Sequence, residues 1–488
     1  MPEPLAFPPE IWLQVFRLVT TPQEADLETH YVPFRAIPMQ ERPIHYQPAL
    51  NARRTLVLVC KEWRQWVNDH MYHMIRIEGG SKSLREALGV PPPGELAPYA
   101  SGPNRRESVN DLVKIVEIST AFYDFDPFNP LGVAEIVQAC PKAEVLIRPY
   151  AGFSRNHVFC RPRYPVPHHS DPNPQRFPQL ASVRRLDWWP ATSGPYTSHP
   201  SNRHGGGGGY LADLLPNLPN LEYLTAGFSE HTSFMGRGFD TVITVRPVSS
   251  TPPESGPQSG ADLTWLRLKT FRVEVEPPHE SLRANEALPT VKWKVPVLKN
   301  LIVIGSIKMV CRVLGSIETV GGTPSPQPAS SSSIPTVGRQ IRVVELLRIP
   351  QNEVATAIPD ILRQCPNVEE LNIRLDQGPV EFATSSGSST GELIRKHFAN
   401  NTQYPSLRIL RLYRDPKQHR LEDELSRAVL TLSLLKIFRD QGMFPRLGQL
   451  DFEGDWSVPS EVSSAFKDAL GKCRDAHWDV NISTLKWD

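Results

Sequence analysis

Apolar residues near the N-terminus recur at spacings of three and four, which indicates a helix. Ile11, Val15 and Leu18 follow this spacing, with Trp12 and Phe16 on an adjacent face. A helix that packs against one neighbour needs a single apolar stripe. This predicted helix is apolar over a wider arc than one packing face needs.

A second segment, from residue 56 onward, also has helical periodicity. Its apolar positions are Leu56, Val59, Cys60, Trp63, Trp66 and Val67, and polar residues occupy the other face. Arg76 and Ile77 then predict a short strand leading out. Two short helices with this much apolar surface cannot cover it themselves, so we expect them to bury it against the following domain or a partner.

After residue 110 a different pattern recurs at irregular intervals. It consists of an apolar residue or cysteine, a proline, a variable position, and apolar residues three apart that lead into an alternating segment. Copies with proline span residues 140–147, 177–186, 218–224, 295–303, 365–373, 404–412 and 444–452. Two proline-free candidates, 268–273 and 341–346, fill the wide gaps between them.

Each copy predicts a helix, a turn and a strand in succession. Helical stretches precede several copies, at residues 133–139, 211–215, 361–364 and 434–438. The proline ends the helix because it disfavours helical backbone at the preceding residue, and the alternating end predicts a strand. One unit cannot bury its own apolar face. We therefore expect an α/β fold in which units stack into a curved solenoid with a parallel sheet on one side. A non-repetitive α/β domain remains the alternative.

The C-terminal region predicts an end cap for this array. A helix from about residue 459 to 473 carries apolar positions on one face, and the following segment predicts a last irregular strand. These positions are Val462, Phe466, Ala469 and Leu470 in the helix and Trp478, Val480, Ile482 and Leu485 after it. The alternative is that Trp478 and Trp487 are exposed anchors for a partner.

Several stretches have compositions that do not form a core. Residues 161–174, 192–209, 246–262 and 321–338 are rich in Pro, Gly, Ser or His, which predicts disordered surface loops. Residues 20–51 contain five prolines and predict an inserted loop between the two N-terminal helical segments. We expect residues 78–109 to be a linker and residues 110–488 to form the repeat domain.

Charge and cysteine usage exclude several classes of partner. The net charge is +1 and no basic block occurs, so we expect no nucleic acid and no anionic membrane as partner. No apolar run approaches the roughly 18 residues that a membrane helix needs. Six scattered cysteines do not form a disulfide framework. These features predict a protein of the reducing cytoplasm or nucleus.

The sequence gives little indication of enzymatic chemistry. No His-Glu-x-x-His motif occurs, and the glycines at 205–209 are not followed by the Lys-Ser/Thr of a phosphate-binding loop. His157, Cys160, His168 and His169 match no standard zinc spacing. We therefore expect no catalytic residues, no metal and no cofactor in this chain.

The two N-terminal segments resemble the F-box family. The family pattern runs Leu-Pro-x-Glu-Ile/Leu-Leu-x-x-Ile-Phe, followed later by Val-Cys-Lys/Arg-x-Trp-Arg. The matching residues are Pro8, Glu10, Ile11 and Phe16 in the first half and Val59, Cys60, Lys61, Trp63 and Arg64 in the second. Phe7 stands at the position of the first leucine. Residues 20–51 replace a link that is usually short.

The resemblance implies that residues 1–77 form a helical module that docks a Skp-family adaptor and, through it, a cullin. The residues implied in adaptor contact are Phe7, Pro8, Ile11, Trp12, Val15, Phe16, Leu56, Val59, Cys60 and Trp63. Some of them must also face the module's own core, and the sequence does not divide the two groups.

The second half of the resemblance concerns the repeats, which are similar to the irregular leucine-rich-repeat arrays behind fungal F-boxes. The proline spacing of about 40 residues exceeds the roughly 20–29 of standard leucine-rich repeats, and the asparagine common after their strands is absent. The resemblance implies a non-catalytic substrate-recognition subunit of an SCF-type ubiquitin ligase. Its repeat domain would bind a protein substrate, and catalysis would belong to the RING subunit and its conjugating enzyme.

Two other functions fit the same sequence. An F-box protein can bind its adaptor outside ubiquitin ligation, as a scaffold, which recovery of a cullin would distinguish. Alternatively, the N-terminal helices only cap a repeat-type interaction protein. In that case residues 1–77 leave no large apolar face uncovered.

Overall fold

The computed structural model of this 488-residue chain describes the helices, the strands and their connecting turns. The described residues are 8–20, 30–34, 42–77, 82–90, 109–118, 130–148, 179–188, 215–228, 263–264, 266–275, 293–305, 317–318, 336–347, 351–374, 403–414, 421–440, 442–454, 456–482 and 485–487. The chain divides into two compact units. Residues 1–30 and 36–261 form the first, and residues 31–35 and 262–488 form the second.

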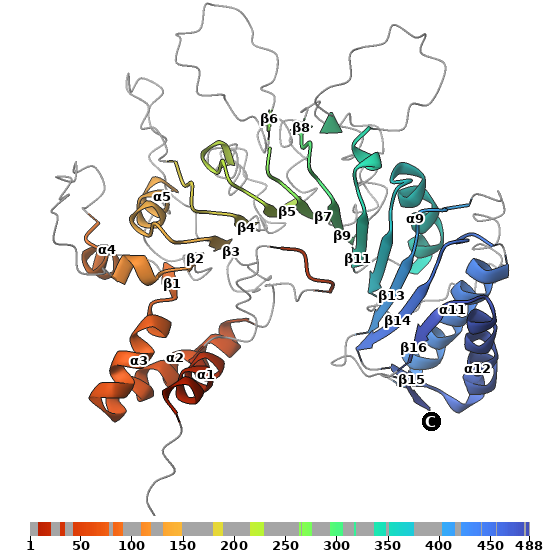
Figure 1. The fold of residues 1–488 in the computed structure, drawn as a ribbon, viewed down its shortest axis with the longest axis horizontal. Helices are drawn as coiled ribbons and strands as arrows, with labels where there is room; N and C mark the ends of the chain where they lie inside the picture. Colours follow the sequence, from red (N-terminus) through yellow and green to blue (C-terminus); the bar gives the residue numbers. More distant parts are fainter. Residues whose placement is uncertain are drawn as a thin grey trace, which may run out of the picture. The chain divides into compact units, whose positions relative to one another are not determined.

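The first unit combines a helical module with short parallel strands (Figure 1). The module consists of α1 (Pro9–Thr20), α2 (Arg42–Val59) and α3 (Lys61–Met71). It is followed by β1 (Met74–Ile77), α4 (Lys82–Ala87), η1 (Val109–Leu112), β2 (Ile115–Ile118), α5 (Pro130–Ala139), β3 (Val145–Arg148), β4 (Arg185–Trp188), η2 (Leu215–Asn217) and β5 (Tyr223–Phe228). The strands pair in chain order from β1 to β5.

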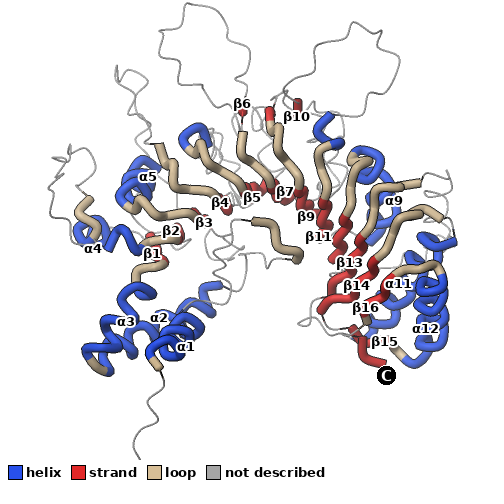
Figure 2. The backbone as a smooth tube through the Cα atoms, viewed as in Figure 1, coloured by secondary structure: helices blue, strands red, loops and turns tan. Residues whose placement is uncertain are grey.

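The second unit continues the alternation of strands and helices (Figure 2). Its main strands are β7 (Thr270–Val275), β9 (Asn300–Gly305), β11 (Val343–Leu347), β12 (Glu370–Arg374), β13 (Ile409–Arg414), β14 (Gln449–Gly454) and β16 (Asp479–Asn481), paired in that order. Its helices are η4 (Thr336–Arg339), α9 (Gln351–Gln364), α11 (Leu421–Asp440) and α12 (Ser460–Asp475). Two small sheets contain β6 (Leu263–Thr264), β8 (Trp293–Lys294) and β10 (Ile317–Glu318), and β15 (Trp456–Val458) and β17 (Leu485–Trp487).

The predicted α/β class with a parallel sheet is confirmed. Within each unit the strands of the long sheet pair in chain order, β1 to β5 in the first and β7 to β16 in the second, and the recorded pairs are parallel. A strand appears at the end of every copy of the repeated pattern. These strands are β3, β4, β5, β9, β12, β13 and β14 after the proline copies and β7 and β11 after the proline-free copies.

In six of the seven copies with proline, the proline lies in a turn that precedes the strand. In the copy at 365–373, the Val368 amide donates to the Cys365 carbonyl at 3.3 Å, which places Pro366 second in the turn. Proline is favoured at this position because its ring presets φ. The residue that closes the turn is buried in each case, as Val368 is here. In the copy at 177–186 the turn instead runs from Leu180 to Val183, without proline.

Neighbouring copies are joined by a repeated backbone contact. The Arg342 carbonyl accepts from the amides of Glu369 and Glu370 at 2.7 and 3.1 Å, and the Glu369 carbonyl accepts from Arg408 and Ile409 at 2.8 and 3.1 Å. The same double acceptance occurs at the carbonyls of His73, Lys114, Glu144, Arg184, Lys269, Lys299 and Arg408. Each copy therefore satisfies the backbone of the next in a fixed register.

The alternating strand residues divide between two faces of the sheet. One face carries buried aliphatic and aromatic residues, among them Leu346, Leu371, Leu412 and Phe452. In the second unit α9, α11 and α12 lie on this side of the strands (Figure 1). The opposite face carries mostly polar residues in the second unit, among them Arg272, Glu345, Asn372 and Asp451, which are buried.

Two predictions about the N-terminal region need correction. The predicted loop 20–51 is shorter, since α2 begins at Arg42. Pro43 is tolerated there because N–H groups in the first turn of a helix have no intrahelical acceptor, so the N–H that proline lacks removes no hydrogen bond. The predicted continuous second helix is interrupted at Cys60, which has extended backbone at φ −158°. The Cys60 sulfur accepts from the Trp63 amide at 3.4 Å and so caps α3.

The predicted domain boundaries also shift. The strand predicted after α3 is β1, which pairs with β2, so the sheet already begins within residues 1–77. The predicted linker 78–109 contains α4. The predicted loops at 161–174, 192–209 and 246–262 lie outside the described residues, and of 321–338 only 336–338 is described, as part of η4. In the predicted helix 211–215 only Leu215 is described, where it begins η2.

The C-terminal helix and last strand are confirmed as α12 and β16. Phe466, Ala469 and Leu470 of α12 are buried, and β16 pairs with β14. Trp478 is buried as well, so the alternative that it is an exposed anchor is wrong. The side chain of Trp487 lies outside the described part of the chain.

Gly454 supplies a direct test of strand packing in the second unit. It lies opposite Arg414 with φ 88°, and a Cβ there would lie 1.9 Å from the Arg414 carbonyl oxygen. We expect Gly454→Ala to lower the free energy of unfolding by about 2–5 kcal/mol, measured by urea denaturation.

The matched control is Gly471→Ala, because no atom lies within 4 Å of a Cβ at this helical position. It is expected to raise the free energy of unfolding by about 0.5–1 kcal/mol, since alanine favours helix. Equal stability of the two variants would contradict the described packing of β13 and β14.

Candidate functional site

The helical module has a small aromatic core of its own. Phe16 of α1 is 1% exposed, and its ring centroid lies 4.9 Å from that of Trp63 and 6.4 Å from that of Trp66 on α3. Trp12 adds a contact to Trp63 at 5.0 Å. Edge and tilted ring contacts of this kind stabilise beyond area burial alone. These rings fix α1 against α3.

A buried arginine ties α2 to the end of α1. The Arg53 Nε donates to the Thr20 carbonyl at 2.8 Å, and the Thr20 hydroxyl donates to the Phe16 carbonyl at 2.6 Å. The last carbonyls of a helix lack intrahelical donors, so Arg53 satisfies one of them. All three helices of the module are thereby held together by specific contacts.

The outward side of α1 carries an apolar stripe. Ile11, Val15 and Leu18, at spacings of four and three, are 42%, 38% and 76% exposed. At the end of α2, Leu58 is 84% exposed and Val59 also faces solvent. We call these five residues the apolar stripe. Exposed aliphatic residues gathered on one small module are typical of a surface that binds a partner.

The structure divides the residues implied in adaptor contact into three groups. Pro8, Ile11, Val15 and Val59 are exposed, whereas Trp12, Leu56, Cys60 and Trp63 are partly exposed. Phe16 is placed in the module's own core. Phe7 lies outside the described residues.

Sequence reasoning did not include four exposed residues among those implied in adaptor contact. They are Leu13, Leu18, Val19 and Leu58. The available signal was the wide apolar arc of α1, since a helix that buries one face needs no leucine or valine on the others. No sequence pattern indicated that Leu58 is exposed, because its exposure depends on where α2 ends.

The polar face of the sheet in the second unit is a second candidate surface. Residues in register across the strands include Arg272, Glu345, Asn372, Arg411 and Asp451. Ile302 of β9 interrupts this row, so its continuous polar part runs from β11 to β14. Four of the five polar residues are buried, and Arg411 is partly exposed. Arg411 is therefore the member of the row that reaches solvent for a directional contact with a polypeptide ligand.

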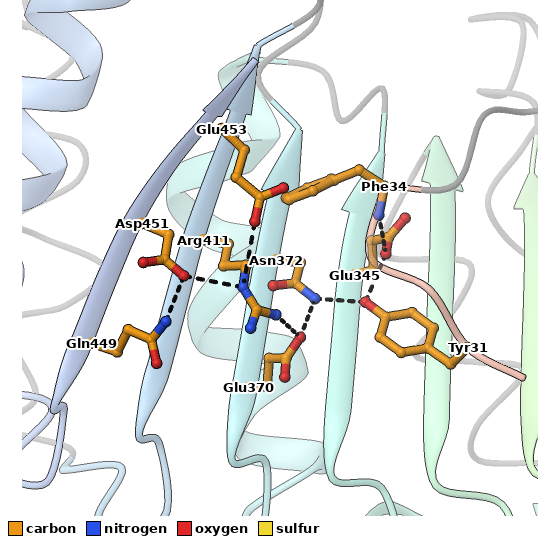
Figure 3. Close-up of polar contacts among 9 residues, drawn as sticks. All are labelled: Tyr31, Phe34, Glu345, Glu370, Asn372, Arg411, Gln449, Asp451 and Glu453. Atoms are coloured by element: carbon orange, nitrogen blue, oxygen red, sulfur yellow. Dashed lines mark hydrogen bonds and ion pairs between the residues drawn. The ribbon is translucent and has the colours of Figure 1, made fainter. Parts of the chain in front are cut away.

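Arg411 is surrounded by carboxylates on this face (Figure 3). Its guanidinium pairs with Glu370, and its Nε lies 3.2 Å from Asp451 Oδ2 and 3.5 Å from Glu453 Oε1. Burial raises the pKa of Glu453; Arg411 lowers it, and Asp451 and Glu370 raise it further. Three carboxylates face one guanidinium, so the cluster is acidic.

A segment from the predicted N-terminal insertion lies on the same face, which the sequence did not predict. Tyr31 and Phe34 contact Glu345 of β11, and Tyr31 contacts Asn372 of β12 (Figure 3). The Phe34 ring also stacks on Tyr413 of β13. No local pattern signals this contact, because the partners are separated by more than 300 residues.

Other sequence-based expectations concern metals and membranes. His157, Cys160, His168 and His169 lie outside the described residues. Within the described ranges, no group of three or more potential ligands is placed to hold a metal ion. No helix in that part of the chain is both long and apolar enough to cross a membrane.

Comparison with protein families and with curated proteins found no match for this chain. The interpretation of both surfaces therefore rests on their residues and geometry.

Proposed function

We propose that this chain is the substrate-recognition subunit of an SCF-type cullin ubiquitin ligase. Its helical module α1–α3 is an F-box that docks a Skp-family adaptor through the apolar stripe. Its strand repeats form an irregular leucine-rich-repeat-like solenoid that holds a protein substrate. The chain itself supplies positioning, and the RING subunit with its conjugating enzyme supplies catalysis.

The observation that carries the adaptor proposal is the concentration of exposed apolar side chains. Of ten exposed large hydrophobic residues among those described, seven lie on α1 or the last two residues of α2. Aliphatic and aromatic anchors on a small surface provide most of the energy of protein contacts. The same module carries the family-like residues Pro8, Glu10 and Trp63.

The repeated backbone contacts support the solenoid proposal. Within each unit, each strand copy satisfies the backbone of the next, and the strands carry buried apolar residues on one face. Neighbour-to-neighbour stacking of this kind is characteristic of repeat proteins, whose sheet faces bind extended partners. The polar row across β11–β14, with Arg411 partly exposed, is the corresponding candidate for substrate contact.

The exposed stripe also bears on the alternative that the N-terminal helices only cap the repeats. A cap covers its apolar residues, but Leu18 and Leu58 are largely exposed. This favours a docked partner. A scaffold that acts outside ubiquitin ligation would make the same contact with the adaptor. It would differ from a ligase subunit in that no cullin is bound.

The experiment that separates ligase from scaffold is purification of the tagged full chain from cells. We expect a Skp-family adaptor and a cullin to be recovered together, and both to be lost in a folded Ile11→Asp, Leu18→Asp double variant, which changes the exposed stripe and leaves the aromatic core of the module intact. Recovery of the adaptor without any cullin would contradict the ligase and favour the scaffold.

A further inference from the structure

Residues Tyr31–Phe34, here called the internal segment, make three kinds of contact with the polar sheet face. The Tyr31 hydroxyl donates to Glu345 Oε2 at 2.7 Å and accepts from Asn372 Nδ2 at 2.5 Å. The Phe34 amide donates to the same Glu345 oxygen at 3.0 Å. The Phe34 ring stacks on Tyr413, with centroids 4.8 Å apart. The polar contacts come from β11 and β12 (Figure 3), and the ring contact comes from β13.

The receiving residues form an ordered site. Glu345 and Asn372 are register partners on β11 and β12, and Arg374 and Tyr413 are partners on β12 and β13. The Arg374 guanidinium lies 5.2 Å from the Tyr413 ring centroid, a cation–π contact on the ring that Phe34 stacks against. The site thus offers a carboxylate and an amide that hydrogen-bond a tyrosine hydroxyl. It also offers the Tyr413 ring, which stacks on an aromatic residue three positions later in the bound segment.

The acceptor is a buried carboxylate. Glu345 is almost fully buried, and burial raises its pKa, whereas Arg272, the Tyr31 hydroxyl, the Phe34 amide and Arg374 lower it. A carboxylate withdrawn from water needs donors, because leaving it without them is costly. Two of its donors, the Tyr31 hydroxyl and the Phe34 amide, come from the internal segment. A peptide bound at this position therefore supplies hydrogen bonds that the buried carboxylate needs.

The internal segment is held in an unfavourable backbone conformation. Phe34 has φ 51°, in the left-handed region that residues with a side chain rarely adopt. Pro33 precedes it, as in a type II turn, but such a turn prefers glycine where Phe34 stands. This strain is kept only because the sheet contacts offset it. A ligand without the strain has an advantage in competition.

The segment is also tethered on both sides, since it lies in sequence between α1 and α2. A tether gives a bound segment an effective concentration of about millimolar. An internal occupant of this kind can exchange with an external peptide of higher intrinsic affinity.

We propose that the face of β11–β13 is a peptide-binding site that takes an extended segment with tyrosine at one position and an aromatic residue three positions later. Tyr31–Phe34 occupies it as an internal ligand, and a protein substrate carrying the same pattern displaces it. This inference rests on the proposed function in one respect, namely that the competing protein is a ubiquitination substrate.

The test uses the full chain and a fluorescent peptide that copies residues 28–37 of this sequence. The receptor is a Tyr31→Ala, Phe34→Ala double variant, which lacks the internal ligand. We expect this variant to bind the peptide at least about tenfold more tightly than the wild type, whose tethered segment competes. A peptide with alanine at both aromatic positions is expected not to bind.

A matched pair of receptor variants locates the binding. In the double-variant background, Glu345→Gln is expected to weaken peptide binding by about tenfold, because hydrogen bonds to a charged acceptor are lost. Glu369→Gln, at an exposed carboxylate paired with Arg342, is expected to leave it unchanged. Equal binding of the two peptides, or equal affinity of wild type and double variant, would overturn the proposal.

A second measurement keeps the proposal testable if the double variant does not fold. Hydrogen exchange at the Phe34 amide of the wild type is expected to occur by local opening, faster than at the amides of β12. Exchange of Phe34 only with global unfolding would show a permanent structural contact and overturn the proposal. Adaptor binding is measured separately. Peptide exchange without adaptor binding would contradict the ligase alone, and adaptor binding without peptide exchange would contradict this inference alone.

Discussion

Replacing both Ile11 and Leu18 with aspartate is expected to weaken binding of a Skp-family adaptor by about 100-fold or more. Each residue is an exposed aliphatic member of the apolar stripe, and the central anchors of an interface contribute about 2 kcal/mol or more each. Aspartate removes the apolar contact and requires desolvation of a charge on docking. The measurement is isothermal titration of the purified full chain with the adaptor.

The control for this variant is Leu266→Asp. Leu266 is 65% exposed, comparable to Leu18, but lies in the turn before β7 of the second unit. We expect its adaptor affinity to equal that of the wild type. Ile11, Leu18 and Leu266 are all exposed, so we expect the midpoint of thermal unfolding to change little in the double variant and in the control. Retained adaptor binding by the folded Ile11→Asp, Leu18→Asp variant would place the docking surface elsewhere.

Replacing Asp187 with alanine is expected to lower the free energy of unfolding by about 3–5 kcal/mol. Arg185 and Asp187 of β4 are both about 99% buried, with Arg185 Nη2 at 2.7 Å from Asp187 Oδ2. The Thr225 hydroxyl donates to the other carboxylate oxygen at 2.6 Å. The alanine variant leaves the guanidinium buried without this carboxylate, although its contact with the Tyr223 ring at 5.1 Å remains. Urea denaturation measures the effect.

The comparison for Asp187 is the exposed pair Arg363–Asp360 on α9, which is 3.0 Å long. Exposed pairs contribute about 0–1 kcal/mol because water and salt screen them. Asp360→Ala is therefore expected to change stability by less than about 1 kcal/mol. If both substitutions cost the same small amount, the first unit does not bury the Arg185 charge as described.

The repeated turn and strand could be predicted from sequence because their determinants are local. In Cys365-Pro366-Asn367-Val368, the proline fixes the turn and the next apolar residue closes it, and the following alternation fixes which strand residues face the core. Because the same local pattern recurs from copy to copy, the same prediction of a turn followed by a strand applies to each of them.

The break at Cys60 was missed because its spacing fits a continuous helix. The available signal was Glu62, since an acidic residue in the first turn favours a helix start at that point. A cysteine cap is uncommon beside serine, threonine, aspartate and asparagine. The extended backbone at Cys60 therefore had no strong signature.

The division of α1 into an inward and an outward side was also beyond the sequence. Val15 and Phe16 are adjacent and both apolar, yet Val15 is exposed and Phe16 buried. The choice depends on Trp63 and Trp66 of α3, which contact Phe16 across the module. Likewise, the Tyr31 contact with Glu345 spans 314 residues, so no periodicity encodes it.

The measurement that tests the central claim most directly is titration of the purified, folded wild-type chain with a purified Skp-family adaptor. We predict saturable one-to-one binding with a dissociation constant of about micromolar or tighter, lost on prior mutation of Ile11 and Leu18. Absence of binding by a well-folded wild type would contradict the F-box and leave a repeat protein with an unexplained apolar stripe.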